Sequence, residues 1–559
     1  MRVPFASAVS GESMLLGAMP GPVRHGETGL CRVQNAVEDY GPAIRVLGSL
    51  CHDPSHRPQP PTTRDAGPAR DNRLSLPFLL RASDPKKDSM VHVMATEPER
   101  DSETLRVWRH QNLPATDWLS ETIDPSFLLL DFSGMLSGAT ESYQDIQEGS
   151  DPLSIRLDPF DIPTDTFSAQ INTLTSHLQA LVIRKPHLKE DFERSCQRGF
   201  FTSTHFQNIL TAYFRLRHYH VTFIHWPTFD PEKISLHLLL AVIMMGATGL
   251  QHRDDHHDPI VTAPLLELAE VYIFAELKKW VKRAADLASS PEGIEICQAA
   301  VLFVALQNNT NSVETRQRIG TKRNPMLIAL LRTSGLVGFK HRIAPHETTW
   351  SQFLHQEICI KVVSWAFMND NILAMFCNHP PVMTVKEMSG HLPCPMWLWE
   401  AEPEEFEARK HELQVGSYPS CFSEAVSGLL GDQWTDSTAA SFAKLDVLHL
   451  HLLIFALQPA VFHYRTSMLP PSSSNILLRA IDRWSLLWAA AYERVPVDER
   501  KWIGLARYAP ELAVLSRRII QVTGTEGGKE SRYLQGTASY NTADLHQFIR
   551  QYGLEDKFW

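Results

Sequence analysis

The chain has 559 residues and a mass of 63.2 kDa, which is enough for about three or four folded units of ordinary size. Hydrophobic residues make up 43% and charged residues 21%, a globular balance that excludes a wholly disordered or fibrous chain. With a formal net charge of −10, the overall field of the protein cannot support nucleic-acid binding, so any contact with DNA has to be local.

The first 115 residues are predicted to be a disordered, Pro-rich region without a core. Of the 36 prolines, 17 precede residue 166, and the stretch RPQPPTTRDAGPARD (57–71) is typical of an extended linker. The first 21 residues contain a broken apolar stretch rather than the compact apolar core of a secretory signal. We therefore do not expect secretion.

Residues 116–170 have a different, acidic-hydrophobic composition. They contain 11 acidic residues and a single basic one, Arg156, and large apolar side chains such as Trp118, Phe127 and Phe132 are interleaved among them. This alternation is typical of activation segments, because repulsion between carboxylates keeps the aromatic side chains available to a partner's groove. A solvated linker that contacts nothing is the equally weighted alternative.

From about residue 171 to the end, apolar residues recur with helical spacing. In the run STHFQNILTAYFRLRHY (203–219) they define one face of a helix: Phe206, Ile209, Leu210, Tyr213 and Phe214. The sequences Asp230-Pro231-Glu232 and Ser290-Pro291-Glu292 predict two helix starts, each with a side-chain cap followed by proline.

Further apolar-periodic runs follow, and convincing strand alternation is absent from the sequence. The runs are MLIALLRTSGL (326–336), EICIKVVSWAFMNDNILAMF (357–376), AKLDVLHLHLLIFALQPAVF (443–462), ILLRAIDRWSLLWAAAYERV (476–495) and PELAVLSRRIIQV (510–522). The uncharged run 234–251 is shorter than the roughly 20 apolar residues of a bilayer span and predicts a buried helix. The predicted fold class is all-α, with one large multi-helix domain, or a two-lobed one, over residues 171–559.

Signatures of catalysis and metal binding are scarce. The sequence has no Gly-rich phosphate loop, no G-x-S-x-G and no H-E-x-x-H, so we expect no enzyme, no catalytic residues and no cofactor. The closest cysteines, Cys377 and Cys394, are 17 residues apart, and Cys51 with His52 and His56 lacks a fourth zinc ligand nearby. The polar run 252–258 could hold a divalent metal, although a solvated loop is the favoured interpretation.

Three segments in order resemble one family. The stretch from Tyr213 and Phe214 through FIHWPTFDPE, followed by LHLLLAVIMMGATG, resembles the opening of the fungal-specific transcription factor domain, the helical middle homology region. The segments TWSQFLHQEICIKVVSWAFMNDNILAMFCNHPPVM and HLPCPMWLWEA are similar to two later parts of it, so the resemblance covers about residues 200–405. The matching positions are His225, Pro227, Thr228, Phe229, Asp230, Trp350, Glu357, Asp370, Pro380, Pro381, Leu392, Pro393, Cys394, Trp399, Glu400 and Ala401.

These residues are interpreted as structural. Pro227 restricts the turn and its predecessor Trp226, and Asp230 can cap the next helix. Phe223, Trp226 and Phe229 are predicted core anchors, and a buried Phe229 would make Phe229→Ala cost about 3–5 kcal/mol.

A fourth segment, SLPFLLRASDP (75–85), is similar to a piece that follows paired two-Cys/two-His zinc fingers in one branch of the family. Residues 1–74 contain neither a finger nor a binuclear zinc cluster. The resemblance therefore implies zinc only if fingers are encoded upstream of Met1. It leaves open whether the chain contacts DNA directly or through partner proteins.

The resemblance implies a nuclear regulator of transcription from a fungus, controlling metabolic or biosynthetic genes through its helical domain. The partners implied are DNA, the transcription machinery through 116–170 and a small-molecule effector, and we expect no membrane. A coregulator that acts only through partners is the alternative. A helical metal enzyme built on 252–258 is a remote one.

Overall fold

The computed structural model describes nine stretches, all within the compact unit formed by residues 58–559. They are 76–86, 164–216, 218–251, 261–341, 347–412, 418–467, 472–497, 499–500 and 503–553. Within these stretches the regular structure is helical, and strand-type pairing is limited to one bridge between His391 and Cys421. The predicted all-α fold class is confirmed.

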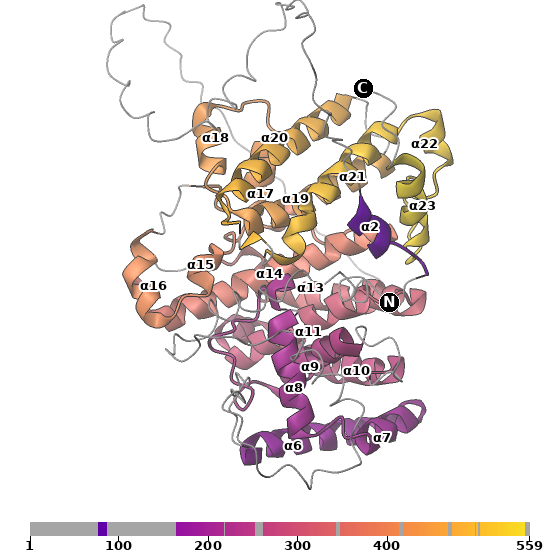
Figure 1. The fold of residues 1–559 in the computed structure, drawn as a ribbon, viewed down its shortest axis with the longest axis vertical. Helices are drawn as coiled ribbons and strands as arrows, with labels where there is room; N and C mark the ends of the chain where they lie inside the picture. Colours follow the sequence, from indigo (N-terminus) through magenta and orange to yellow (C-terminus); the bar gives the residue numbers. More distant parts are fainter. Residues whose placement is uncertain are drawn as a thin grey trace, which may run out of the picture. The chain divides into compact units, whose positions relative to one another are not determined.

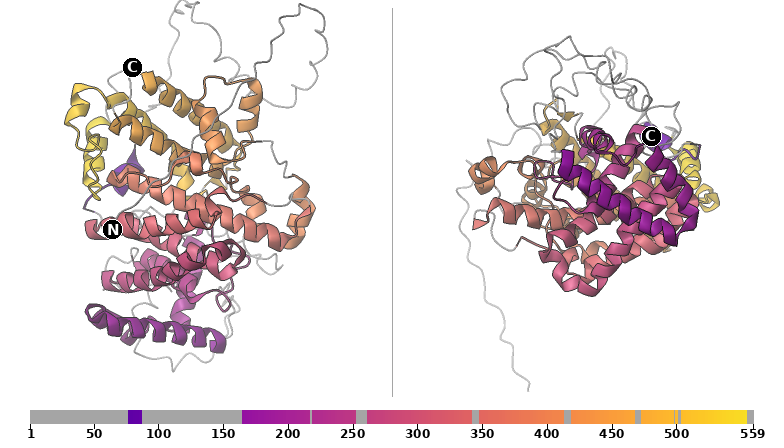
Figure 2. Two further views of the ribbon diagram at one scale, coloured as in Figure 1. Left: turned by 180° about the vertical axis from the view of Figure 1, so that it is seen from behind. Right: turned by 90° about the horizontal axis from the view of Figure 1, so that it is seen from below.

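Two groups of helices lie on either side of one long helix, α14 (Trp350–Cys377), as Figures 1 and 2 show. The first group contains α6 (Thr164–Arg184), α7 (Lys189–Gln197), α8 (Ser203–Leu216), α9 (Leu236–Gln251), α10 (Ala263–Trp280), α11 (Pro291–Asn308), α12 (Val313–Arg318) and α13 (Asn324–Thr333). The second contains α15 (Met396–Trp399), α16 (Pro403–Arg409), α17 (Phe422–Leu430), α18 (Asp436–Phe442), α19 (Val447–Thr466), α20 (Ser472–Arg494), α21 (Ala509–Val522), α22 (Glu526–Glu530) and α23 (Ala543–Tyr552).

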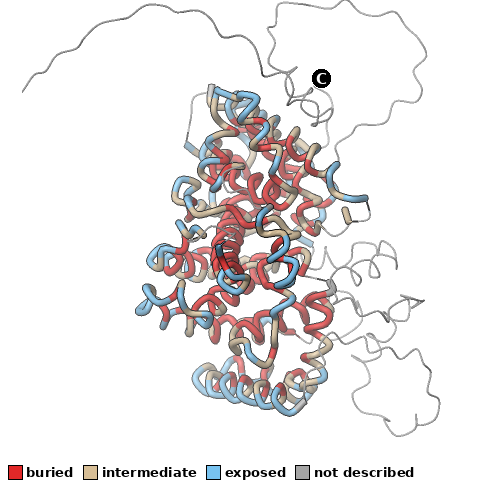
Figure 3. The backbone as a smooth tube through the Cα atoms, turned by 90° about the vertical axis from the view of Figure 1, so that its left-hand side faces the viewer, coloured by how far each residue is buried: buried red, intermediate tan, exposed pale blue. Residues whose placement is uncertain are grey.

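Helix α14 is the element that both groups share. It packs on α11 of the first group and on α19 of the second, and 22 of its 28 residues are buried. One continuous apolar core extends through both groups (Figure 3). The two groups are therefore parts of one helical domain rather than separate lobes with separate cores.

In the part of the chain that the structure describes, two helices, α14 and α19, are long and apolar enough to cross a bilayer, and the bent pair Ala263–Ser289 and Pro291–Asn308 meets the same test when taken as one span. In their most apolar windows, however, 89% of α14 and 83% of α19 is buried inside the fold. Protein side chains therefore cover these apolar surfaces, as in a core helix of a large domain.

The predicted helix starts have different outcomes. The Ser290 hydroxyl accepts from the backbone N–H of Gly293 at 3.2 Å and caps α11, as predicted. The predicted start at Asp230 is wrong: its carboxylate accepts from Glu232 N at 3.0 Å and closes a single turn. Helix α9 begins only at Leu236, because Ser235 caps it and donates its own N–H to Glu295 Oε2 at 2.6 Å.

Two predicted boundaries also need correction. Helix α6 begins at Thr164, inside the segment 116–170, because Phe167 is buried in the core. Helix α2 (Pro77–Ala82) lies inside the region 1–115, which was predicted to have no core, and it packs against α21 and α23. The remaining parts of both predicted regions lie outside the described residues.

Helices α8 and α9 approach each other closely at Gly246. A Cβ atom at this position would lie 2.8 Å from both the Cγ2 atom and the backbone oxygen of Ile209. Contacts this short cannot be relieved by turning a side chain, because one of the atoms belongs to the backbone. The small-residue helix of the first motif is therefore a requirement of packing.

Gly246→Ala should lower the free energy of unfolding by about 1–3 kcal/mol, because overpacking outweighs the better helix propensity of alanine. Urea unfolding followed by circular dichroism measures the loss. Gly338→Ala is the matched control, since its Cβ would meet only the Ser389 hydroxyl at 3.3 Å. Equal stability of the two variants would contradict the close approach.

Candidate functional site

The first motif is divided between core and surface. Tyr213 and Phe214 of α8 are fully buried, whereas Pro227 and Thr228 are exposed on the turn. Phe229 is only partly buried, with its ring 4.8 Å from that of Phe214, so the predicted full-burial cost for Phe229→Ala is too large. Phe223, with no exposed surface, is the true anchor of this segment.

The second motif ends in a turn that Asp370 holds in place. One carboxylate oxygen, Oδ2, accepts from the backbone N–H groups of Val382 and Met383 at 2.7 and 2.8 Å, and Oδ1 accepts from Asn324 Nδ2 at 2.9 Å. The turn between α14 and these amides carries the two prolines of the motif, Pro380, which is exposed, and Pro381, which is partly buried. Burial raises the pKa of Asp370 to about 6 in spite of these donors.

Hydrogen bonds join the third motif to the N-terminal half of α14. Glu357 Oε1 accepts from the backbone N–H of Cys394 at 2.7 Å, and the Trp350 indole donates to Ala401 O at 3.2 Å. Leu392, Pro393, Cys394 and Trp399 are buried, whereas Glu400 is exposed at the end of α15. The third motif therefore packs over the N-terminal half of α14.

His225 brings the first motif to the other two. Its ring centroid lies 4.9 Å from that of Trp399 and 5.9 Å from that of Trp350, both in edge-to-face geometry. Its Nδ1 atom is 2.8 Å from the Thr228 hydroxyl, which orients the ring. Three segments that the sequence singled out separately thus converge on one place.

Buried and partly buried polar side chains gather at this place, which we call the α14 polar centre. Its members are His225, His341, Glu357, Lys361, Cys394, Trp399, Asp446 and His449. Glu357 and Lys361 come from α14, Cys394 and Trp399 come from the third motif, and Asp446 and His449 lie at the start of α19. His225 belongs to the first motif, and His341 lies between η6 (Leu336–Gly338) and α14. Sequence reasoning named Glu357 but missed Lys361, although a lysine within an uninterrupted apolar run is a visible signal of a buried charge.

Glu357 and Lys361 lie one helical turn apart and neither has any exposed surface. Burial raises the pKa of Glu357, while the Lys361 ammonium and the Cys394 amide counteract that rise. Glu357 Oε2 lies 3.2 Å from Nε2 of His341. The Lys361 ammonium sits 4.4 Å above the Trp399 ring and has no hydrogen-bond partner.

His449 links α19 to the third motif. Its Nδ1 atom is 2.8 Å from the Asp446 carboxylate and its Nε2 atom is 2.7 Å from Pro393 O. Burial alone would lower the pKa of His449, but the carboxylate and the carbonyl outweigh burial and hold the pKa above its ordinary value. The backbone N–H of Asp446 also points to Nδ1 at 3.3 Å, so the Asp446 and His449 side chains together form the capping box of α19.

The polar centre contains buried donors that the protein does not satisfy. Lys361 Nζ and Trp399 Nε1 both lack a hydrogen-bond partner while being closed off from solvent. A buried ammonium without a hydrogen bond is costly, and a small molecule with an anionic or acceptor group would lower that cost. The arrangement is suited to binding an anionic or acceptor group.

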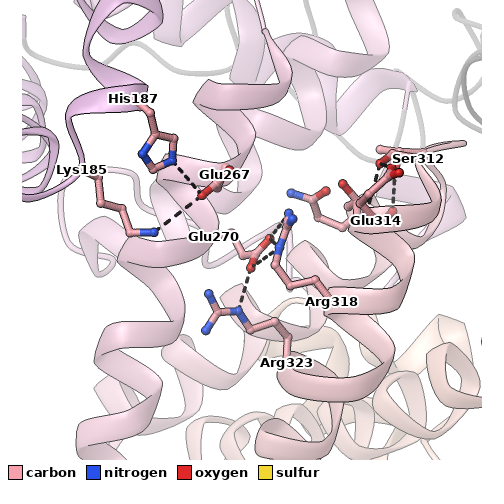
Figure 4. A network of polar contacts seen from close by, with 11 residues as sticks. Lys185, His187, Glu267, Glu270, Ser312, Glu314, Arg318 and Arg323 are labelled. Carbon is pink, nitrogen blue, oxygen red and sulfur yellow. Dashed lines mark hydrogen bonds and ion pairs between the residues drawn. The ribbon is translucent and has the colours of Figure 1, made fainter.

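A second polar network joins α10 to the segment after α11, as Figure 4 shows. The fully buried carboxylate of Glu270 accepts from Arg318 at 2.8 and 3.0 Å and from Arg323 at 2.7 Å. The two arginines lie at the end of α12 and at the end of a π-helical turn, η5 (Ile319–Arg323). Sequence reasoning missed this network, because its members are far apart in the chain.

The histidine candidates do not assemble into a metal centre in the part of the chain that the structure describes. There, no group of three or more His, Cys, Asp or Glu side chains could hold a metal ion. His451, two residues beyond His449 on α19, is buried beside Phe455 with both ring nitrogens lacking hydrogen bonds. The predicted polar run 252–258 lies outside the described residues.

The fold and the converging motifs define a helical regulatory domain. Residues 210–485 match the family described as fungal specific transcription factor domain, and this part of the chain is a domain of that family. The match contains all three motifs and the whole polar centre. It confirms the family resemblance on which the sequence-based interpretation depends.

Curated relatives are fungal transcription factors. The chain is 24% identical over 357 residues to transcription factor verF of Penicillium polonicum, covering 58% of this chain and 48% of the relative. It is 23% identical over 261 residues to transcription factor 1 of Elsinoe fawcettii, covering 42% of this chain and 25% of the relative. It is 26% identical over 179 residues to transcription factor PfmaH of Pestalotiopsis fici, covering 31% and 17%.

The chain thus spans less than half the length of each of these three relatives. No solved structure matches it. The names support the predicted class, a fungal transcriptional regulator, and none of them is the name of an enzyme.

Glu357→Ala should destabilise the protein by about 3–5 kcal/mol, because it leaves a buried ammonium and the Cys394 amide uncompensated. Adding Lys361→Met should restore more than about 1 kcal/mol of that loss, since the unpaired charge is then gone. Urea unfolding of both single variants and the double variant gives the coupling free energy. The exposed pair Lys189 and Glu193 serves as control, with an expected coupling below about 0.5 kcal/mol.

Strict additivity of the two substitutions would contradict a buried interaction between Glu357 and Lys361.

Two buried histidines, His218 and His451, are predicted to lower stability in acid. Burial lowers the pKa of His451 to about 4, and that of His218 likewise. Between pH 6.5 and pH 4 these two rings bind more protons in the unfolded chain, so their contribution to the free energy of unfolding decreases as the pH falls, whereas Asp370, whose pKa is raised by burial, contributes in the opposite sense. His451→Leu should make this decrease shallower, while His411→Gln at an exposed position should leave it unchanged. An unaltered slope for His451→Leu would contradict the buried, neutral ring.

Proposed function

We propose that this protein is a fungal transcriptional regulator whose helical domain controls the acidic-hydrophobic segment 116–170. The observation that carries the proposal is the convergence of the three family motifs on α14 within the matched domain. Regulation of metabolic or biosynthetic genes, and a nuclear location, belong to the same proposal. Exposed basic residues at 278–283 and Lys86 are candidate import signals.

The proposal predicts that the acidic-hydrophobic segment drives transcription. The full chain fused to an unrelated DNA-binding domain should activate a reporter in fungal cells. Deleting 116–163 should reduce that activation at least about tenfold, because the carboxylate-flanked aromatic residues would be lost. Deleting 20–67, a stretch of the same length, is the control. Equal activity of the two deletions would assign 116–163 the role of a linker.

Direct contact with DNA and action through partners are distinguished by chromatin occupancy of the tagged chain. Peaks that share a sequence motif in cells without related factors support direct binding. Occupancy that disappears when a partner is deleted supports the coregulator alternative. The protein is a regulator in both outcomes, and an absence of occupancy in both backgrounds, with and without the partners, would contradict the proposal.

A small anionic effector is a further part of this proposal. The observation that favours it is the Lys361 ammonium, which is buried in the α14 polar centre without a hydrogen-bond partner. Citrate and inorganic phosphate are simple probes of such a site. A rise in the melting temperature of the full chain that Lys361→Met abolishes would support an anion site. An identical rise in both proteins would place anion binding elsewhere.

A further inference from the structure

A short N-terminal helix, α2, docks on the C-terminal helices of the domain. Residues 76–86 lie against α21 and α23, more than 400 residues later in the chain, as Figures 1 and 2 both show. The next described residue along the chain, Thr164, begins α6. Helix α2 is therefore separated in sequence from the surface that it contacts and from its next anchored neighbour.

The apolar contact of α2 is complete along one face. Leu76, Phe78, Leu79 and Ala82 are all at least 95% buried. The Phe78 ring stacks on Tyr508 with centroids 3.8 Å apart and planes within 8° of parallel. The opposite face, with Pro77 and Arg81, is exposed.

Polar contacts fix the orientation of α2. The Glu511 carboxylate accepts from the backbone N–H groups of Phe78 at 3.3 Å and Leu79 at 3.0 Å, so a residue of α21 supplies the N-terminal cap that α2 lacks. At the other end, the Ser83 hydroxyl lies 3.2 Å from His546 Nδ1 of α23. Side chains of α21 and α23 therefore contact both ends of this docked segment.

A helix of six residues is unstable alone in water, so its order comes from this contact. Apolar anchors on one face, an exposed opposite face and a cap supplied by the receptor are the features of a helical peptide in a groove. The area involved is that of four apolar side chains, which is small compared with the core that holds α14.

We propose that residues 76–86 are a releasable clasp, and that the surface formed by Tyr508, Glu511 and α23 is its docking site. Lys86 and Thr164 flank the stretch 87–163 in the sequence. When α2 is docked, both belong to segments that are packed in the domain; when α2 is released, only Thr164 does. The docking claim is independent of the proposed function, and only its consequence for the segment 116–163 rests on it.

A labelled peptide of residues 74–86 tests the docking site on the full chain. In wild type, the tethered segment competes at a high effective concentration, so the peptide should bind poorly. In the released variant Phe78→Asp/Leu79→Asp the site is free, and the peptide should bind at least about tenfold more tightly, measured by fluorescence anisotropy. Lys86→Ala, at an exposed position of the same segment, should behave as wild type.

Specificity is tested in the same assay. Adding Glu511→Gln to the released variant should weaken peptide binding at least about fivefold, because the charged cap is lost. A peptide carrying both aspartates should not bind. No binding of the wild-type peptide to the folded released variant at about 100 µM would overturn the proposal.

Hydrogen exchange on the wild-type chain covers the case in which the released variant does not fold. A clasp should open without the domain, so the amides of residues 78–82 should exchange at least about tenfold faster than those of α21. Equal protection of both segments would show that α2 is an integral core helix and would overturn the proposal. Neither experiment measures transcription, so failure of the docking proposal is distinguishable from failure of the proposed regulatory function.

Discussion

The burial of three ionisable side chains along α14 is the constraint on which the domain depends. Glu357, Lys361 and Asp370 have no exposed surface, and a buried charge is tolerated only when other groups compensate for lost water. The Asp370 carboxylate accepts hydrogen bonds from two backbone amides of the turn after α14, and the Glu357 carboxylate accepts one from the amide of Cys394. The positions of both later motifs therefore follow from charges inside one helix.

Helix positions were largely predictable because the apolar periodicity of these segments is strong. The errors occurred where distant contacts decide the outcome: α9 begins at Leu236 because Glu295, on α11, accepts from Ser235, and α2 is ordered because Glu511 caps it. The site residues could be named from the sequence, but their proximity in the fold could not be predicted from it. His225 contacts Trp399 only through the packing of complete helices, and Lys361 is significant because its ammonium is buried without a hydrogen-bond partner.

The same logic connects structure to regulation. The polar centre joins the two helix groups through α14, and it contains a buried cation without a hydrogen-bond partner. An anionic ligand at that point would stabilise contacts between both groups at once, which is how binding at one site can bias a whole domain. The docked α2 adds a second connection, from the far end of the domain to the start of the chain segment that contains 116–163.

The central claim, that buried charges of α14 hold the second and third motifs in the domain, is tested most directly by hydrogen exchange of the full wild-type chain. The amides of Val382, Met383 and Cys394 lie in irregular segments outside helices. Because buried carboxylates accept from them, we predict that they exchange as slowly as the core amides of α14, through global unfolding. Exchange as rapid as that of exposed turns would contradict the account.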